Sequence, residues 1–165
     1  MLDVTALVLE DHATLRRQFA ALDDARSPAA LAAVWKGLAR MLDVHAACEE
    51  TVFYPALLKK GDDGDEETED AIKDHNKIRD AVAEAAKADV GSDAWWKAVG
   101  TARYENSDHL AEEEREALSD FRRHASDKDR ERLAVAWLDW RYEHDSGAGV
   151  DTSDKNAETY IKENS

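Results

Sequence analysis

Apolar residues recur every three or four positions through most of the chain, a spacing that predicts amphipathic α-helices. In residues 3–24, one helical face would carry Val4, Leu7, Val8, His12, Leu15 and Phe19. Short alternating runs of Val, Ile and Thr are absent, and only seven glycines and two prolines interrupt the sequence. The pattern therefore predicts an all-α protein.

Turn and cap residues divide the chain into five predicted helices. Ser27-Pro28 is a helix start, Gly91-Ser92 ends one helix and caps the next, and Ser126 with Asp129 resembles a capping box. The predicted helices cover residues 3–24, 28–58, 66–88, 93–125 and 126–144. Pro55 is expected to bend or tighten the end of the second. Because short connections join long helices, we expect an up-down-up-down four-helix bundle with an additional C-terminal helix.

Composition suggests where this bundle ends. Residues 1–125 are expected to form the bundle, and residues 126–144 an extra helix packed on it through Leu133, Trp137 and Trp140. Gly, Asp, Ser, Lys and Asn dominate from Asp145 onward. Residues 145–165 are therefore expected to be a mobile acidic tail with a short helical piece at most.

The charge of the chain narrows the choice of partners. Its 22 Lys and Arg residues against 37 Asp and Glu residues give a net charge of −15, which repels nucleic acid and anionic membranes. The sequence has no apolar run of about 18 residues that could span a membrane. A single cysteine forms no internal disulfide, and the N-terminus lacks the features of a signal peptide. We expect a soluble, cytoplasmic protein.

An internal repeat carries the strongest chemical signal. Residues 9–16 align with residues 72–79, and residues 45–50 align with residues 109–114. Each half thus supplies one helix with Asp-His and one helix with His-x-x-x-Glu-Glu. The repeated histidines and the glutamates four residues after two of them are His12, His45, Glu49, His75, His109 and Glu113. Two such helix pairs can be related by a pseudo-twofold axis that the repeated residues face.

These six residues suit a metal site. The i, i+4 spacing places His45 and Glu49 on one helix face, and likewise His109 and Glu113. Two buried carboxylates without a cation would each cost several kcal/mol, a cost that two metal ions remove. One histidine alone has an ordinary structural explanation, but four in register with two carboxylates favour a metal pair. Mixed nitrogen and oxygen ligands suit iron better than calcium or magnesium.

Other metal architectures fit the sequence less well. Ferritin-like bundles use Glu-x-x-His on two helices, and no histidine here has a glutamate three residues before it. The zinc-protease motif His-Glu-x-x-His is absent, and one cysteine excludes clustered thiolate zinc sites.

The order of the four histidines and two glutamates resembles the hemerythrin-like family, also called the HHE cation-binding domain. The segment Glu49-Glu50-Thr51-Val52-Phe53-Tyr54-Pro55 resembles the stretch that follows the family's first bridging glutamate. The resemblance implies a four-helix bundle with an oxo- or hydroxo-bridged pair of iron ions. It implies that His12 and His45 bind one iron and that His75 and His109 bind the other. Glu49 and Glu113 would bridge both.

The sequence departs from the oxygen-carrying hemerythrins at Arg79, where they have a second histidine on the third helix. Tyr54 is the nearest candidate by type to fill that ligand position. On an ideal helix Tyr54 points about 140° away from Glu49, although Pro55 disturbs the geometry. Aromatic packing is the alternative role for Tyr54.

Neighbours of these residues have simpler expected roles. Cys48 is expected in the core. Glu50 and Glu114 are expected to face solvent or a neighbouring helix. Arg16 and Arg79 are expected to be solvated or to pair with acids; Asp11, Asp74 and the bridging glutamates are the candidates.

A di-iron centre with few other polar groups predicts a small ligand such as O2, hydrogen peroxide or nitric oxide. If the Tyr54 phenolate binds iron, it favours Fe(III), and the prediction shifts toward catalase-like peroxide chemistry. The alternative is reversible O2 binding, storage or sensing, including sensing of nitric oxide or iron, without catalysis. A metal-free interaction bundle fits poorly, since it leaves Glu49 and Glu113 buried and unpaired.

Overall fold

The computed structural model describes all 165 residues, and every regular element in it is helical. The elements are α1 (Val4–Asp24), α2 (Pro28–Cys48), the π-helical turn η1 (Glu49–Phe53), α3 (Tyr54–Lys60), α4 (Gly64–Ala86), α5 (Asp93–Arg115), α6 (Ala117–His124), α7 (Asp127–His144) and α8 (Ala157–Asn164). The prediction of an all-α protein is confirmed.

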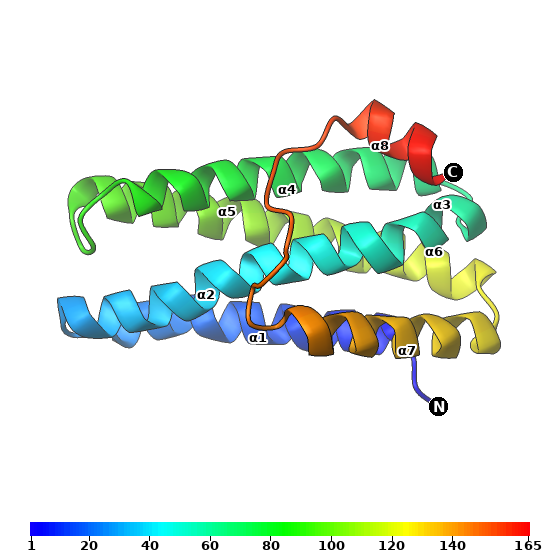
Figure 1. The fold of residues 1–165 in the computed structure, drawn as a ribbon, viewed down its shortest axis with the longest axis horizontal. Coiled ribbons are helices and arrows are strands. Elements are labelled where there is room, and N and C mark those ends of the chain that lie inside the picture. The colour runs from blue at the N-terminus through cyan, green and yellow to red at the C-terminus, as the bar shows by residue number, and fades with distance from the viewer.

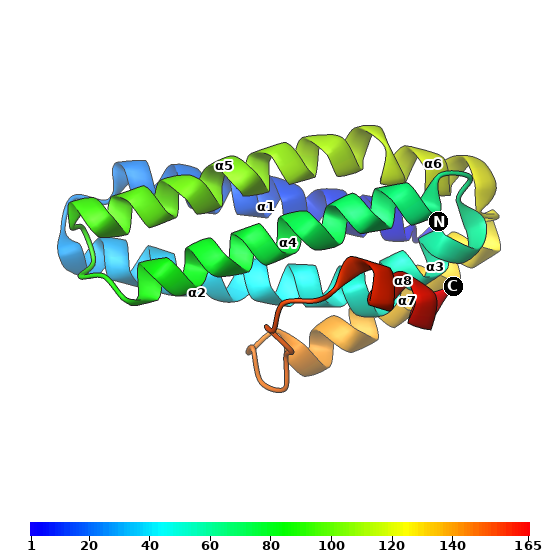
Figure 2. The same ribbon diagram turned by 90° about the horizontal axis from the view of Figure 1, so that it is seen from above.

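Four long helices, α1, α2, α4 and α5, lie side by side as a helical bundle (Figure 1). The colour gradient in Figure 1 shows that the chain runs in opposite directions in α1 and α2, and likewise in α4 and α5. Seen from above, α7 and α8 both lie outside these four helices (Figure 2). Helix α7 contacts α1, α2 and η1, and α8 contacts α4 and α3.

The predicted cap residues begin three of the helices. The Ser27 hydroxyl accepts a hydrogen bond from the Ala30 N–H at 3.2 Å. Ser92 accepts one from the Trp95 N–H, and Ser126 one from the Asp129 N–H, each also at 3.2 Å. These bonds satisfy backbone donors that the first turn of a helix leaves without a partner.

Two predicted helices are interrupted. The second, expected over residues 28–58, changes to a π-helical turn at Glu49 and returns to an α-helix at Tyr54. Pro55 has no N–H to donate to the Thr51 carbonyl, so the regular α-helical bonding pattern cannot continue through it. The fourth, expected over residues 93–125, is divided at Glu116, whose φ of −107° and ψ of −83° leave the α-helical region.

The apolar core consists of two clusters separated along the bundle. One cluster includes Val8 on α1 and Ile72 on α4, and the other includes Leu15 and Ile78 on the same two helices. His12 and His75 each lie between these apolar residues in the chain. A polar layer therefore crosses the bundle between two apolar regions, and this layer contains the candidate site.

The C-terminal segment was expected to be a mobile tail with a short helical piece at most. The structure contains such a piece, α8, and packs it against α4 and α3. Tyr160 of α8 is only 9% exposed and joins the apolar cluster that contains Val8. The sequence pattern did not predict this packing.

Candidate metal centre

The six repeated side chains come together in the polar layer. His12 comes from α1, His45 from α2, Glu49 from η1, His75 from α4, and His109 and Glu113 from α5. None of the six residues is more than 4% exposed. Residues up to 101 positions apart in the chain (His12 and Glu113) therefore form one buried cluster.

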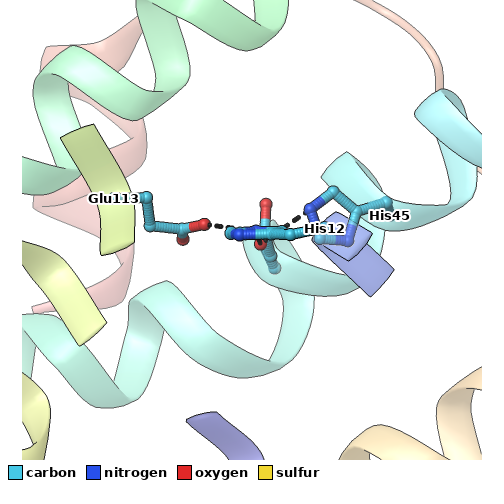
Figure 3. Close-up of side chains that lie close together, drawn as sticks. His12, His45 and Glu113 are labelled. Atoms are coloured by element: carbon cyan, nitrogen blue, oxygen red, sulfur yellow. Dashed lines mark ion pairs between the residues drawn. The ribbon is translucent and has the colours of Figure 1, made fainter. Parts of the chain in front are cut away.

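His12, His45, Glu49 and Glu113 form the first of two groups in this cluster. Their ligand atoms all lie within 4.8 Å of one another. The Nε2 atom of His12 is 3.0 Å from Oε2 of Glu113, and Nε2 of His45 is 3.0 Å from Oε1 of Glu49. Figure 3 shows His12, His45 and Glu113 meeting from three helices. This group can hold one metal ion.

Glu49, His75 and His109 form the second group. The Nε2 atom of His75 is 3.2 Å from Oε2 of Glu49, and Nε2 of His109 is 3.9 Å from the same oxygen. Thus Oε1 of Glu49 faces the first histidine pair while Oε2 faces the second. One carboxylate with its two oxygens directed to separate pairs of imidazoles has the arrangement that a bridging ligand needs.

Tyr54 lies beside the second group because of the π-helical turn. A π-helical turn bonds residue i to residue i+5, and the Tyr54 N–H donates to the Glu49 carbonyl. The turn therefore brings Tyr54 over Glu49, which an ideal α-helix would not do. The Tyr54 hydroxyl donates to Oε1 of Glu113 at 3.1 Å and to Oε2 of Glu49 at 3.3 Å. Its ring centre is 5.8 Å from that of His75.

The polar atoms of the first group test whether a cation fits. Nε2 of His12 and His45, Oε1 of Glu49 and Oε2 of Glu113 are buried without a hydrogen-bond partner. The two 3.0 Å contacts, His12 with Glu113 and His45 with Glu49, lack hydrogen-bond geometry. Buried polar atoms without partners are rare and costly in proteins. Two imidazole nitrogens and two carboxylate oxygens facing one another are a donor set that a metal ion satisfies.

The shifted pKa values in the cluster also indicate a site that attracts a cation. Burial opposes a charged imidazolium, but Glu113 and Glu49 outweigh it and raise the pKa of His12 to about 10. A similar balance with Glu49 and Glu50 raises the pKa of His75 to about 9. Burial and the neighbouring Glu113 and Glu49 carboxylates raise the pKa of Tyr54. The carboxylates thus attract positive charge to this layer, in the form of protons or of metal ions.

A second carboxylate faces the Nδ1 atom of each histidine, on the side away from the cluster. The distances are 2.9 Å for His12 and Glu114, 3.3 Å for His45 and Asp11, 2.8 Å for His75 and Glu50, and 3.9 Å for His109 and Asp74. The first three are hydrogen bonds, and the fourth is longer than one. A carboxylate at Nδ1 keeps a proton there and leaves Nε2 free for a metal ion.

These four carboxylates also belong to the repeat. Asp11 and Asp74 directly precede His12 and His75, while Glu50 and Glu114 directly follow Glu49 and Glu113. Each of these carboxylates faces a histidine on a different helix, and not the histidine of its own segment. Glu50 was expected to face solvent or a neighbouring helix. The second of these alternatives holds: Glu50 is 4% exposed and is hydrogen-bonded to His75 of the neighbouring helix α4. The repeat itself was the signal that could have identified this role.

Positively charged side chains contact these carboxylates. Arg16 contacts Glu114 at 2.7 Å, Lys77 contacts Asp74 at 2.7 Å, and Arg141 of α7 pairs with Asp11. Arg79 was expected to be solvated or to pair with an acid, with Asp11, Asp74 and the bridging glutamates as candidates. It is 6% exposed, and its Nη2 donates to both oxygens of Glu50 at 2.7 and 2.8 Å.

A small cavity of about 20 Å³ reaches the cluster between α4 and α5. Its lining includes His109 and Glu113 of the cluster, and the remaining lining residues are Glu67, Asp70, Ala71, Asp74, Glu112, Glu116 and Ala117. A cavity of this size holds about one water molecule.

Cys48, expected in the core, is fully buried in the apolar cluster that contains Val8, and burial raises the pKa of its thiol. A buried thiol that keeps its proton is a poor nucleophile.

Fold and site together define a helical protein with buried histidine and glutamate clusters that can hold metal ions. The model of the hemerythrin HHE cation binding domain matches residues 3–136, and the chain belongs to this family. The resemblance seen in the sequence is thereby confirmed. No curated protein and no solved structure matches the chain. None of its helices has the length and apolar character needed to cross a membrane.

Proposed function

We propose that the four long helices form the up-down-up-down bundle of this family and hold two iron ions in an oxo- or hydroxo-bridged centre. His12 and His45 would bind one iron, and His75 and His109 the other. Glu49 and Glu113 would bridge them. Two observations support this assignment. Buried ligand atoms of the first group lack hydrogen-bond partners, and the two carboxylate oxygens of Glu49 face different histidine pairs. Mixed imidazole and carboxylate ligands support iron as the metal.

We propose that the protein decomposes hydrogen peroxide in a catalase-like reaction, in which two peroxide molecules yield one dioxygen and two water molecules. Bound iron would supply the electron transfer and a position for a small ligand. The position of Tyr54 carries this proposal, because its oxygen lies within hydrogen-bond distance of both bridging carboxylates. As a phenolate beside iron it would stabilise Fe(III) and oppose reversible O2 carriage, which begins from Fe(II).

The surroundings of the site support a small substrate. The cavity beside His109 and Glu113 has room for a molecule of about the size of water, and its acidic lining offers no group that would recognise an organic anion. Arg79, at the position of the missing histidine, is engaged by Glu50. It therefore does not supply a ligand in place of that histidine.

Metal analysis tests the iron assignment. We expect about two iron ions per chain in protein produced with iron. Glu49→Ala and Glu113→Ala should each remove most of this iron, because each would contact both ions. Glu10→Ala, a change at an exposed residue of α1, serves as the control and should keep it. One metal ion per chain, zinc alone, or full iron content in either bridging variant would contradict the assignment.

Kinetic and spectroscopic measurements test the reaction. The iron-loaded protein should release dioxygen from hydrogen peroxide with many turnovers per chain, followed with an oxygen electrode. The anaerobically reduced protein should give no stable oxygenated spectrum when O2 is admitted. A stable and reversible spectrum without peroxide turnover would instead favour O2 binding, storage or sensing.

A further inference from the structure

The C-terminal segment, which lies beyond the residues matched by the family model, reaches the second histidine pair. Helix α8 lies along the outside of α4, the helix that carries His75 (Figures 1 and 2). The contact between this segment and the candidate metal centre is made at Glu50, the residue after the proposed bridging Glu49.

Glu50 holds together four other residues. One carboxylate oxygen is 2.8 Å from Nδ1 of His75, and both oxygens accept hydrogen bonds from Arg79. Lys155, ahead of α8, places its Nζ 3.0 Å from Oε2 of Glu50. The hydroxyl of Tyr160 donates to the backbone carbonyl of Glu50. The C-terminal segment thus contacts both the side chain and the backbone of this residue.

A pair of hydrogen bonds fixes the backbone of the C-terminal segment beside His75. The side-chain amide of Asn76 donates to the Lys155 carbonyl at 2.8 Å and accepts from the Lys155 N–H at 3.0 Å. Because Asn76 is the next residue after His75, the segment is attached directly to the turn of α4 that presents the imidazole.

The carboxylates that face Nδ1 of the first histidine pair are more exposed than Glu50. The side chain of Glu114, which serves His12, is 30% exposed, and that of Asp11, which serves His45, is 16% exposed. The side chain of Glu50 is only 3% exposed. The fourth carboxylate, Asp74, stands 3.9 Å from His109. The two metal positions are therefore supported unequally, and the C-terminal segment acts on the one that contains His75.

We propose that Lys155 and Tyr160 are positioning residues for the metal ion at His75 and His109. They hold Glu50 in place, Glu50 holds the imidazole of His75 through Nδ1, and the segment thereby sets how firmly that ion is retained. Loss of such an outer contact typically weakens metal binding by about 10- to 100-fold. The inference rests on the proposed two-iron centre.

Iron release to a chelator tests this proposal in the full-length, iron-loaded protein. The wild-type protein should release its two ions in two kinetic phases. Lys155→Met and Tyr160→Phe should each accelerate one phase about tenfold and leave the other unchanged. Lys155→Arg keeps the positive charge beside Glu50 and should restore the slower release.

Matched controls come from exposed residues of α8 and α7. Lys162→Met removes a lysine from α8 itself, and Tyr142→Phe changes a tyrosine that is 91% exposed. Neither should alter the release of iron. Circular dichroism of each variant would show whether it retains its helices. Loss of helix in both Lys155→Met and Tyr160→Phe would overturn the positioning role in favour of a purely structural one.

The outcomes separate this inference from the proposed function. Two ions in the wild type with unchanged release in both variants would overturn the inference alone. Equal acceleration of both phases would also overturn it, because a general loosening would then explain the effect. A wild-type protein that holds no iron would overturn the proposed function and, with it, this inference.

Discussion

At the scale of single residues, Tyr54 shows how one irregular turn changes the chemistry available to the site. The π-helical turn adds one residue between Glu49 and Tyr54 relative to an α-helical repeat, so both side chains point into the same layer. Burial and two carboxylates disfavour the charged phenolate of Tyr54. The hydroxyl therefore keeps its proton unless a metal ion offers compensating charge.

Tyr54→Phe separates ligation from packing, because it keeps the ring and removes only the oxygen. If the phenolate binds Fe(III), the wild-type protein should show a visible charge-transfer band that the variant lacks. Peroxide turnover should fall in the same variant. Tyr104→Phe, at a tyrosine that is 67% exposed, is the control. An unchanged spectrum and unchanged turnover would leave Tyr54 as a packing residue.

Glu67, which is not itself a proposed ligand, provides a residue-scale test of pH dependence. Burial and the charges of Asp120, Asp63 and Glu116 raise the pKa of Glu67 from 4.5 to about 7. Between these values the folded protein binds more protons at this site than the unfolded chain. The free energy of unfolding therefore falls as the pH rises through this range.

Glu67→Gln removes this penalty. Relative to the wild type, the variant should gain thermal stability at pH 8, and the gain should shrink toward pH 5. Thermal unfolding followed by circular dichroism, with both proteins in the same iron state, measures the difference. Glu66→Gln, on the exposed side of the same helix, should show no such pH-dependent gain. A gain of equal size at both pH values would contradict the role given to Glu67.

At the scale of elements, α7 is more than an added helix on the surface. Its Trp137 is 2% exposed, and the centre of its ring lies 6.1 Å from that of His45. Its Arg141 pairs with Asp11, the carboxylate that faces Nδ1 of His45. Helix α7 thus contacts His45 and its carboxylate partner, as the C-terminal segment contacts the carboxylate partner of His75.

Trp137→Ala should destabilise the protein by about 3–5 kcal/mol, because it removes a large buried aromatic side chain and leaves a cavity. Chemical denaturation measures this change in the free energy of unfolding. Leu138→Ala, at the next position of α7, changes a side chain that is 45% exposed and should cost much less. Similar losses for the two variants would show that α7 does not depend on Trp137 for its packing.

At the scale of the whole molecule, we expect the polar layer to couple metal binding to folding. Four imidazoles and two carboxylates lie between two buried apolar clusters. Without a metal ion the layer retains unsatisfied buried atoms, and these weaken the fold at its centre. A metal ion bound only by the folded state adds stability in proportion to the logarithm of its concentration.

Iron-loaded protein should therefore unfold at a higher temperature than metal-free protein. At a metal concentration of about 100 times the dissociation constant, the added stability is about 2.7 kcal/mol. Thermal scans of both forms measure the difference. In Glu49→Ala the difference should nearly vanish. Equal unfolding temperatures for the two wild-type forms would contradict the coupling.

Features that depend on local spacing were predictable from the sequence alone. Helical periodicity and cap residues determined the all-α class, and the interval of four residues determined that His45 and Glu49 share a helix face. The repeat determined that the second half would supply the same residue types. These properties arise within single helices, so no knowledge of their packing was needed.

Only the tertiary structure decided which residues of different helices contact one another. Asp11 faces His45 and Glu50 faces His75, and both contacts depend on the rotation of one helix against the next. Tyr160 reaches Glu50 across 110 residues of chain. A bend or tightening at Pro55 was expected, but the π-helical turn before it and the resulting direction of Tyr54 were not. Contacts between helices depend on packing geometry, which the order of residues along one helix does not contain.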